Sequence, residues 1–197
     1  MRILIAPDSF KESLTAIEVA HAIARGLKHE LPDAEFDLVP IADGGEGTVD
    51  AIVGAVSGAV VSCEVIGPLG EKRQANYGLV DGGATAIIEM AEASGLALVP
   101  ISKRDPNRTT TYGCGELVAD ALNRGVKHIV FGVGGSATND GGLGMCQALG
   151  ARFFSEDGEE IVVPICGGDL ASIKQADCKR LSHRWRLPQP VMSIIRC

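Results

Sequence analysis

The stretch from Gly132 to Gly144, GVGGSATNDGGLG, is a glycine-rich loop between two apolar segments. Residues 127–133 before it read as a strand and residues 143–149 after it read as a helix. Glycine lets backbone N–H groups approach an anion closely, and a helix N-terminus adds partial positive charge. The stretch therefore predicts an anion-binding loop. A tight structural connection, with Asp140 capping the helix, is the alternative.

Two further strand-loop-helix units occur at the start of the chain. Residues 2–6 are strand-like, and from Thr15 apolar residues recur at helical spacing behind a T-x-x-E capping box completed by Glu18. Residues 36–41 are again strand-like, and the loop ADGGEG separates them from a helix-like segment at 48–56. Consecutive units of this kind predict a parallel sheet.

The middle of the chain has a different pattern. Residues 59–89 form β-rich segments separated by Gly-Pro and Asp-Gly-Gly turns, which predicts antiparallel or mixed pairing. A helix is expected at 116–123 and a strand at 151–154, so the fold class is α/β. Residues 178–197 contain five Lys/Arg and no acid, whereas residues 1–177 contain 13 Lys/Arg and 25 Asp/Glu. This shift predicts a basic arm outside the domain.

Composition excludes several classes of protein. The 197 residues are 46% hydrophobic, which is typical of a folded globular chain rather than a disordered one. A formal net charge of -7 argues against general binding of nucleic acid, since phosphate backbones need a basic surface. The N-terminal apolar run at residues 3–7 is too short for a signal peptide, and no run reaches membrane-spanning length. We therefore expect a cytoplasmic protein with no membrane partner.

Three polar loops follow the predicted strands: APDSFKES at 6–13, ADGGEGT at 42–48 and GGSATNDGG at 134–142. In open parallel sheets, ligands bind beyond the carboxyl ends of the strands, where such loops converge. We expect the three loops to share one site. Several carboxylates near them are oxygen ligands of the kind that Mg²⁺ accepts beside water and phosphate. These candidates are Asp8, Asp43, Glu46, Glu89 and Asp140.

A dinucleotide-binding domain is a competing interpretation of the glycine loop. Gly132, Gly134 and Ala137 form a G-x-G-x-x-A pattern, and acids at 156–157 lie near the distance expected for a ribose-binding residue. Against it, Asp140 would repel a pyrophosphate unless a cation intervened. The chain has no Walker G-x-x-x-x-G-K-[ST] motif, so an ordinary P-loop mechanism is unsupported. We favour metal-assisted phosphate chemistry.

Five motifs, in order, carry a resemblance to a known family: IAPDSFKESLTAIEVA, PIADGGEGTVDAIV, IEMAEASGL, NRTTTYGCGELVADAL and GVGGSATNDGGLGMCQALGARF. Together they resemble the N-terminal part of the bacterial glycerate kinases of the glyoxylate and glucarate pathways, over about residues 1–177. The resemblance implies ATP-dependent phosphorylation of D-glycerate at the 2-hydroxyl. It also implies a flavodoxin-like (Rossmann-like) parallel-sheet portion and a second, restriction-enzyme-like mixed-sheet α/β portion.

The resemblance suggests a division of the chain into three parts. Residues 1–58 would begin the flavodoxin-like domain, residues 59–177 would form an incomplete second domain, and residues 178–197 would be a basic tail foreign to the family. Family members are longer, and the tail lacks their later CDVxNPL and FGPQKGA motifs. A truncated, catalytically inactive remnant or a weak ligand-binding fragment is therefore the alternative function. Such a fragment would self-associate through exposed sheet edges.

If the site is complete, roles can be assigned to its residues. Asp8 is the candidate for accepting the hydroxyl proton, Lys11 offsets phosphate or glycerate charge, and Asp43 is catalytic. Mg²⁺ would be held by Asp140 or Asp43. The candidates for binding substrate or phosphate are Ser9, Ser13, Gly44, Gly45, Glu46, Gly134, Gly135, Ser136, Thr138 and Asn139.

Overall fold

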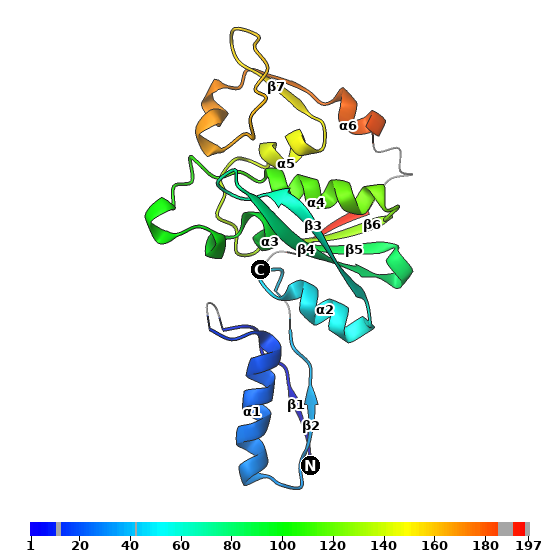
Figure 1. Cartoon of the computed structure of the whole chain (residues 1–197). Coiled ribbons are helices and arrows are strands. Elements are labelled where there is room, and N and C mark those ends of the chain that lie inside the picture. Colours follow the sequence, from blue (N-terminus) through cyan, green and yellow to red (C-terminus); the bar gives the residue numbers. More distant parts are fainter. Residues whose placement is uncertain (11–12, 42, 185–190, 196–197) are drawn as a thin grey trace.

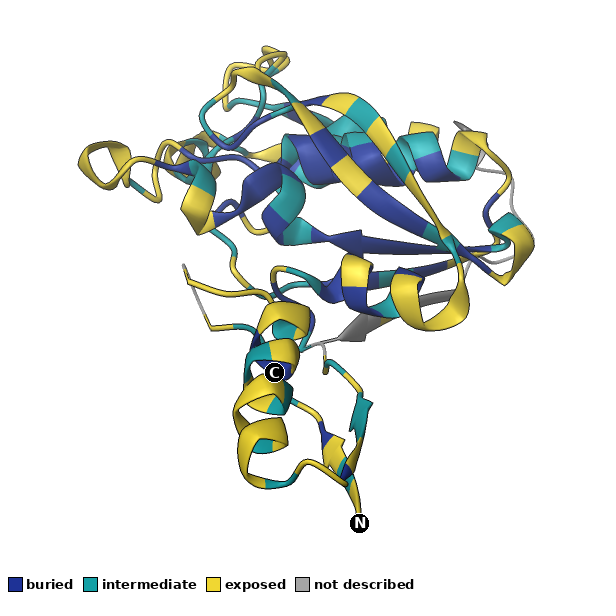
Figure 2. Ribbon diagram, turned by 60° about the horizontal axis from the view of Figure 1, so that its bottom comes forward, coloured by how far each residue is buried: buried dark blue, intermediate teal, exposed yellow. Residues whose placement is uncertain are grey.

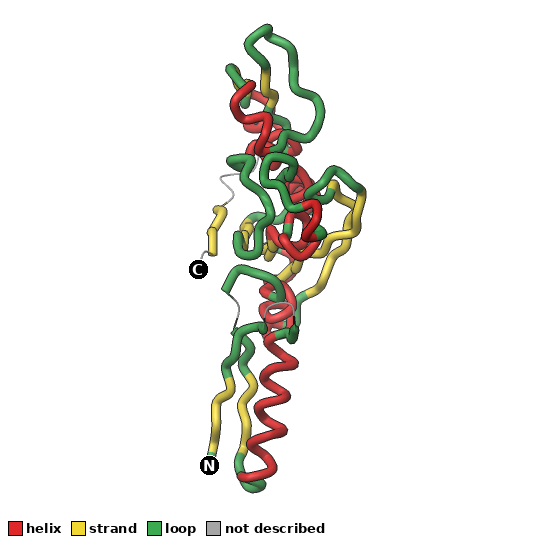
Figure 3. The backbone as a smooth tube through the Cα atoms, turned by 90° about the vertical axis from the view of Figure 1, so that its left-hand side faces the viewer, coloured by secondary structure: helices red, strands yellow, loops and turns green. Residues whose placement is uncertain are grey.

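The computed structural model describes residues 1–10, 13–41, 43–184 and 191–195 of the chain. Its N-terminal unit consists of strand β1 (Arg2–Ile5), helix α1 (Ala16–Glu30) and strand β2 (Glu35–Leu38), and the two strands pair in parallel. Figures 1 and 3 show this unit extending from one end of the molecule. The predicted strand, helix and parallel pairing are confirmed.

The capping box at the start of α1 is also confirmed. The Thr15 backbone N–H donates to Glu18 Oε2 at 2.8 Å, and the Glu18 N–H donates to Thr15 Oγ1 at 3.3 Å. Each residue thus satisfies a backbone donor that the helix cannot satisfy itself.

A five-stranded mixed sheet forms the centre of the molecule, in the order β3-β4-β5-β6-β9. Its strands are β3 (Ala59–Ile66), β4 (Lys72–Val80), β5 (Thr85–Glu89), β6 (His128–Gly132) and β9 (Val191–Ile195). The β3-β4 and β4-β5 pairs are antiparallel, whereas β5-β6 and β6-β9 are parallel. The mixed pairing predicted for residues 59–89 is confirmed.

Helices cover both faces of this sheet (Figure 1). Helix α4 (Tyr112–Asn123) packs on one face, where Tyr77, Ile88 and Leu117 are fully buried. Helix α2 (Thr48–Val56) packs on the other, through Val49 and Val53 against β4 and β5. Buried residues in Figure 2 are concentrated in these layers.

The position of α2 bears on the domain division. Its apolar side chains pack on the five-stranded sheet, although the sequence grouped it with the N-terminal unit. The boundary after residue 58 stays a prediction, and this packing favours a boundary ahead of the helix. None of the helices in the described part of the chain is long and apolar enough to cross a membrane.

The remaining elements extend from the central sheet. They are α3 (Met90–Ser94), α5 (Leu143–Ala148), β7 (Arg152–Phe154), β8 (Gln175–Asp177) and α6 (Lys179–Arg184), with short 3₁₀ turns at Asp81–Gly83, Leu96–Leu98, Ile101–Lys103 and Gly167–Ser172. The helix expected at 116–123 begins four residues earlier, at Tyr112. The segment expected as a basic arm contributes β9, whose sequence VMSII is apolar enough to extend the sheet beside β6. Self-association through the sheet edges stays a prediction.

Candidate functional site

The candidate site lies at one edge of the central sheet. Strands β5 and β6 run in parallel, and their last residues, Glu89 and Gly132, are partners in the register. The loops that follow these two strands therefore both begin at the carboxyl-terminal edge of the sheet. Open parallel sheets bind their ligands at this edge. Residues 43–47, which lead into α2, lie at this edge as well, because they contact the loop after β6.

The two glycine loops are in direct backbone contact. The Gly134 N–H donates to the Gly44 carbonyl oxygen at 3.0 Å. A Cβ atom on Gly134 would lie 2.7 Å from the Cα of Gly45, and one on Gly132 would lie 2.4 Å from the Gly44 oxygen. Only glycine permits this approach. The convergence predicted for these two loops is confirmed.

The first polar loop adjoins the second across a cavity. Ser9, Ser13 and Glu46 line a space of about 280 Å³, together with Phe10, Leu14, Thr15, Glu18, Gly47 and Asp50. Asp8 is exposed, and its Oδ1 accepts a hydrogen bond from the Ser9 N–H at 2.7 Å. Lys11 lies outside the described residues, so its role stays a prediction.

Glu89 caps helix α2 from a neighbouring strand. The N-cap residue of α2 is Gly47, which has no side chain to satisfy the first N–H groups. Glu89 Oε2 accepts from the Gly47 N–H at 3.2 Å, and Oε1 accepts from the Val49 N–H. Its side chain is buried, and burial raises the pKa of Glu89 from its ordinary 4.5 to about 7, against the lowering effect of these hydrogen bonds. The residue considered as a metal ligand thus joins α2 to β5.

The raised pKa of Glu89 predicts a pH dependence of stability. The folded protein holds this proton more tightly than the unfolded chain, so its stabilising contribution is present below about pH 4.5 and is lost as the pH rises to about 7. We expect the unfolding free energy of the wild type, minus that of Glu89→Gln, to fall by roughly 2 to 3 kcal/mol between pH 5 and pH 8. Urea denaturation of both proteins measures it. A difference that stays constant across this range would show that Glu89 titrates normally.

Asp140 is buried, and both of its carboxylate oxygens accept hydrogen bonds from the protein. Its Oδ2 accepts from the N–H and the hydroxyl of Thr111 at 2.8 and 2.7 Å and from the Gly144 N–H at 3.3 Å. Its Oδ1 accepts from the Gly142 N–H at 2.9 Å, and the residue is 1% exposed. These bonds favour the capping alternative at the start of α5 over metal ligation. Within the described residues, no three His, Cys, Asp or Glu side chains cluster as a metal site built from protein ligands alone would require.

Asp43 has a different setting from Asp140. It is half-buried beside the glycine loops, and its Oδ1 accepts from the Gly45 N–H at 2.8 Å. The assignment of Asp43 as catalytic residue and metal ligand stays a prediction.

A second cavity of about 280 Å³ lies beside the glycine loop after β6. Ser136 and Thr138 line it from that loop, and Arg104 and Thr109 line it from the segment after β5. Asn139 is exposed nearby in the chain. Arg104 and Thr109 were not among the predicted site residues. The cations of KRDPNRTTT, placed just before a predicted helix, were the signal that could have found them.

The dinucleotide-binding alternative fits this geometry poorly. The backbone of Gly45 fills the space against Gly134 through which a pyrophosphate would approach. The acids at 156–157 lie in an exposed turn that follows β7.

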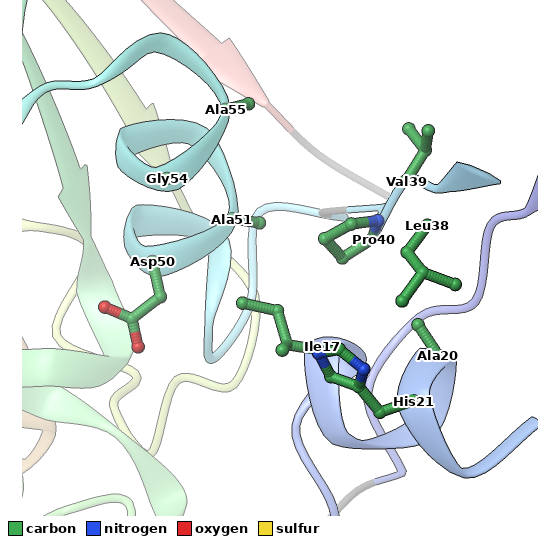
Figure 4. Close-up of a pocket in the computed structure, with 10 residues that line it drawn as sticks. All are labelled: Ile17, Ala20, His21, Leu38, Val39, Pro40, Asp50, Ala51, Gly54 and Ala55. Atoms are coloured by element: carbon green, nitrogen blue, oxygen red, sulfur yellow. The ribbon is translucent and has the colours of Figure 1, made fainter. Parts of the chain in front are cut away.

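A third cavity, of about 450 Å³, separates α1 from α2 (Figure 4). Its lining is mostly apolar, and Asp50 and His21 are its titratable members. The full lining is Ile17, Ala20, His21, Leu38, Val39, Pro40, Asp50, Ala51, Gly54 and Ala55. None of the described residues that line it is a Lys or Arg, so it offers no permanent positive charge for an acidic substrate.

Comparison with known proteins gives one consistent result. The glycerate kinase family model matches residues 3–193, which extends past residue 177. The chain is 53% identical over 184 residues to a glycerate kinase of Haemophilus influenzae and 52% identical over 186 residues to one of Bacillus subtilis, covering 93% and 94% of this chain. It is 53% identical to the glycerate 2-kinase of Escherichia coli.

A solved structure agrees with these matches. The crystal structure of a Salmonella typhimurium protein assigned as glycerate kinase 2 superimposes with a TM-score of 0.74 at 53% identity, over 92% of this chain and 50% of that one. The three curated relatives are each covered over 48% of their length. The chain thus spans about half the length of the relatives it matches.

Proposed function

The chain belongs to the glycerate kinase family, and from this membership we propose that it takes part in the ATP-dependent phosphorylation of D-glycerate at the 2-hydroxyl. The single observation that carries the proposal beyond family membership is the contact between the two glycine loops at the carboxyl edge of the sheet. Phosphoryl transfer depends on positioning and charge neutralisation. Two glycine loops held together at the ends of the strands can position a substrate, and their backbone N–H groups can donate to its anionic oxygens.

Roles at this edge follow from position. Asp8, which is exposed and precedes the cavity-lining Ser9 in the chain, accepts the proton of the attacking hydroxyl. Lys11 offsets anionic charge. The loop from Gly134 to Asn139 holds an anionic group of one substrate.

Asp43, rather than Asp140, is the proposed ligand for Mg²⁺. Both oxygens of Asp140 accept protein hydrogen bonds in a buried position, whereas Asp43 lies beside the glycine loops at the edge where phosphate would bind. Mg²⁺ typically takes one or two carboxylates together with phosphate oxygens and water. When bound, it would neutralise charge on the transferred phosphoryl group.

The Asp43→Asn variant tests this assignment. The amide oxygen can still accept from the Gly45 N–H, so the substitution removes the charge and keeps this hydrogen bond. We expect the affinity for ATP with Mg²⁺ to fall about 10-fold, because a charged ligand is lost, while the melting temperature stays nearly unchanged. Calorimetric titration and thermal melts measure the two quantities. Asp37→Asn, which alters an exposed ion pair with Arg2 in the N-terminal unit, is the control.

Equal affinities of Asp43→Asn and the wild type, combined with a lowered melting temperature, would mean that Asp43 only shapes its loop. ADP release that depends on D-glycerate, followed in a coupled assay, tests the kinase proposal itself. Binding of D-glycerate without turnover would favour the second candidate, a ligand-binding remnant of the family.

A further inference from the structure

The cavity between the glycine loop and the segment after β5 has polar side chains from both segments, set among the apolar Leu96, Val99, Pro106 and Ala137. Ser136 and Thr138 form one wall, and Arg104 and Thr109 belong to the other. Its volume of about 280 Å³ lies just below the range of roughly 300–1,000 Å³ for sites that hold drug-sized ligands. It therefore suits a small acid or one end of a ligand better than a whole nucleotide.

Backbone hydrogen bonds fix the two walls relative to each other. Gly95 and Ser136 form an antiparallel bridge, in which the Leu96 N–H donates to the Gly135 oxygen at 2.8 Å and the Ala137 N–H donates to the Ser94 oxygen at 2.9 Å. A side-chain bond from Thr109 to the carbonyl oxygen of residue 137 adds a further tie at 2.9 Å. Because these two segments are already ordered, ligand binding does not lose free energy by ordering them.

Arg104 brings a positive charge to the cavity, and the hydrogen bonds that position its guanidinium go to uncharged backbone carbonyl oxygens. Its Nε donates to the Val99 carbonyl oxygen at 3.1 Å and its Nη2 to that of Leu96 at 3.4 Å. None of the ion pairs between described residues includes Arg104. Asp105 also lines the cavity and carries a negative charge. Its Oδ1 accepts two hydrogen bonds from Asn107 at 3.0 Å, and none of the ion pairs between described residues joins it to Arg104. A guanidinium has five N–H donors, so others remain for a ligand.

The hydroxyl groups on the facing wall supply another donor. Ser136 Oγ and Thr138 Oγ1 lie 2.8 Å apart, and Ser136 Oγ also accepts from the Thr138 N–H at 3.1 Å. Two hydroxyls carry two protons, and only one of these lies between the two oxygens. The second proton is left to donate to an acceptor in the cavity.

We propose that this cavity binds the carboxylate of the substrate, with Arg104 and the hydroxyl pair of Ser136 and Thr138 as its donors. The inference rests on the proposed function, because it assigns one end of D-glycerate to a place beside the glycine loop. A planar guanidinium matches the two oxygens of a carboxylate. Phosphate shares this anionic chemistry, so the test includes it.

Binding to this chain tests the assignment directly. D-Glycerate, its neutral amide glyceramide and inorganic phosphate are titrated into the wild type by calorimetry. We expect Arg104→Gln to weaken D-glycerate binding about 10-fold, the effect of losing a charge-assisted hydrogen bond in a partly exposed site. Its affinity for glyceramide should stay within about 2-fold of the wild type, since the amide carries no charge to lose.

Arg108→Gln is the matched control. It removes the same charge from the same segment, but Arg108 lines a neighbouring cavity with Leu69 and Lys103. We expect it to bind D-glycerate within about 2-fold of the wild type, because long-range charge effects are screened by salt. If Arg104→Gln does not fold, Ser136→Ala provides a second test of the subsite. We expect its affinity for D-glycerate to be about 3-fold to 10-fold lower than that of the wild type, because one hydrogen bond is missing.

Three outcomes would overturn the proposed subsite. In the first, the wild type would bind no D-glycerate. In the second, the wild type and the cavity variants would bind D-glycerate with equal affinity. In the third, Arg104→Gln would weaken the binding of inorganic phosphate and leave that of D-glycerate unchanged. Failure of the kinase proposal is distinguishable. It would appear as D-glycerate binding that depends on Arg104 without ADP release, even after the chain is joined to the half of a relative that it does not match.

Discussion

Residues 1–197 alone are expected to phosphorylate D-glycerate at least about 100-fold more slowly than the same chain joined to the half of a relative that it does not match. In-line transfer needs both substrates held in register, and small misplacements cost about that factor. The N-terminal unit has a sheet of two strands, and Leu4 is 64% exposed and Val39 50% exposed on it. These apolar surfaces lack the packing that would hold the first polar loop rigidly against the second.

A coupled assay for ADP release measures both rates at saturating ATP and D-glycerate. Reactions without D-glycerate serve as the reference for both chains, so that background ADP release can be subtracted. Equal rates for the short and joined chains would show that residues 1–197 contain the whole catalytic apparatus, and the exposed apolar surface of the two-stranded N-terminal unit would then have no catalytic consequence.

Sequence patterns predicted the elements that depend on interactions between residues close together in the chain. The capping box of Thr15 and Glu18 lies within four residues of chain, and the helix begins where it indicates. The strand-loop-helix pattern around Gly132–Gly144 gave β6 and α5, and its excess of glycine indicated a close approach of backbone. The sequence could not show that the approaching backbone would be Gly44–Gly45, because that contact joins loops far apart in the chain.

The roles that the sequence did not predict depend on contacts between residues far apart in the chain. Glu89 caps α2 across 40 residues of sequence, so no motif connects it with Val49. Asp140 had two interpretations in the sequence. Its hydrogen bonds to the Gly142 and Gly144 N–H groups favour capping of α5, and its bonds to Thr111, 29 residues away, could not be read from a local motif. Arg104 had no strand-end position to mark it as a site residue. It lies in the site because the Gly95–Ser136 bridge brings its segment to the glycine loop.

The contact between the two glycine loops leads to the second large expected effect. Gly134→Ala is expected to destabilise the fold by about 2 kcal/mol or more, in the range seen for overpacked interiors. The new Cβ would lie 2.7 Å from the Cα of Gly45 and 2.8 Å from its nitrogen, and backbone atoms cannot move aside as a flexible side chain can. Separation of the loops would also weaken the hydrogen bond from Gly134 to Gly44 and displace Ser136 from the proposed carboxylate subsite.

Urea denaturation and D-glycerate titration of Gly134→Ala measure both consequences, with Gly26→Ala as the matched control. Gly26 lies within helix α1, and a Cβ there meets nothing within 4 Å. Because alanine is the better helix former, we expect that control to be neutral or more stable by up to about 1 kcal/mol, with unchanged ligand affinity. Wild-type stability and affinity in Gly134→Ala would mean that the loops can separate freely, and that their contact neither builds the site nor positions the substrate.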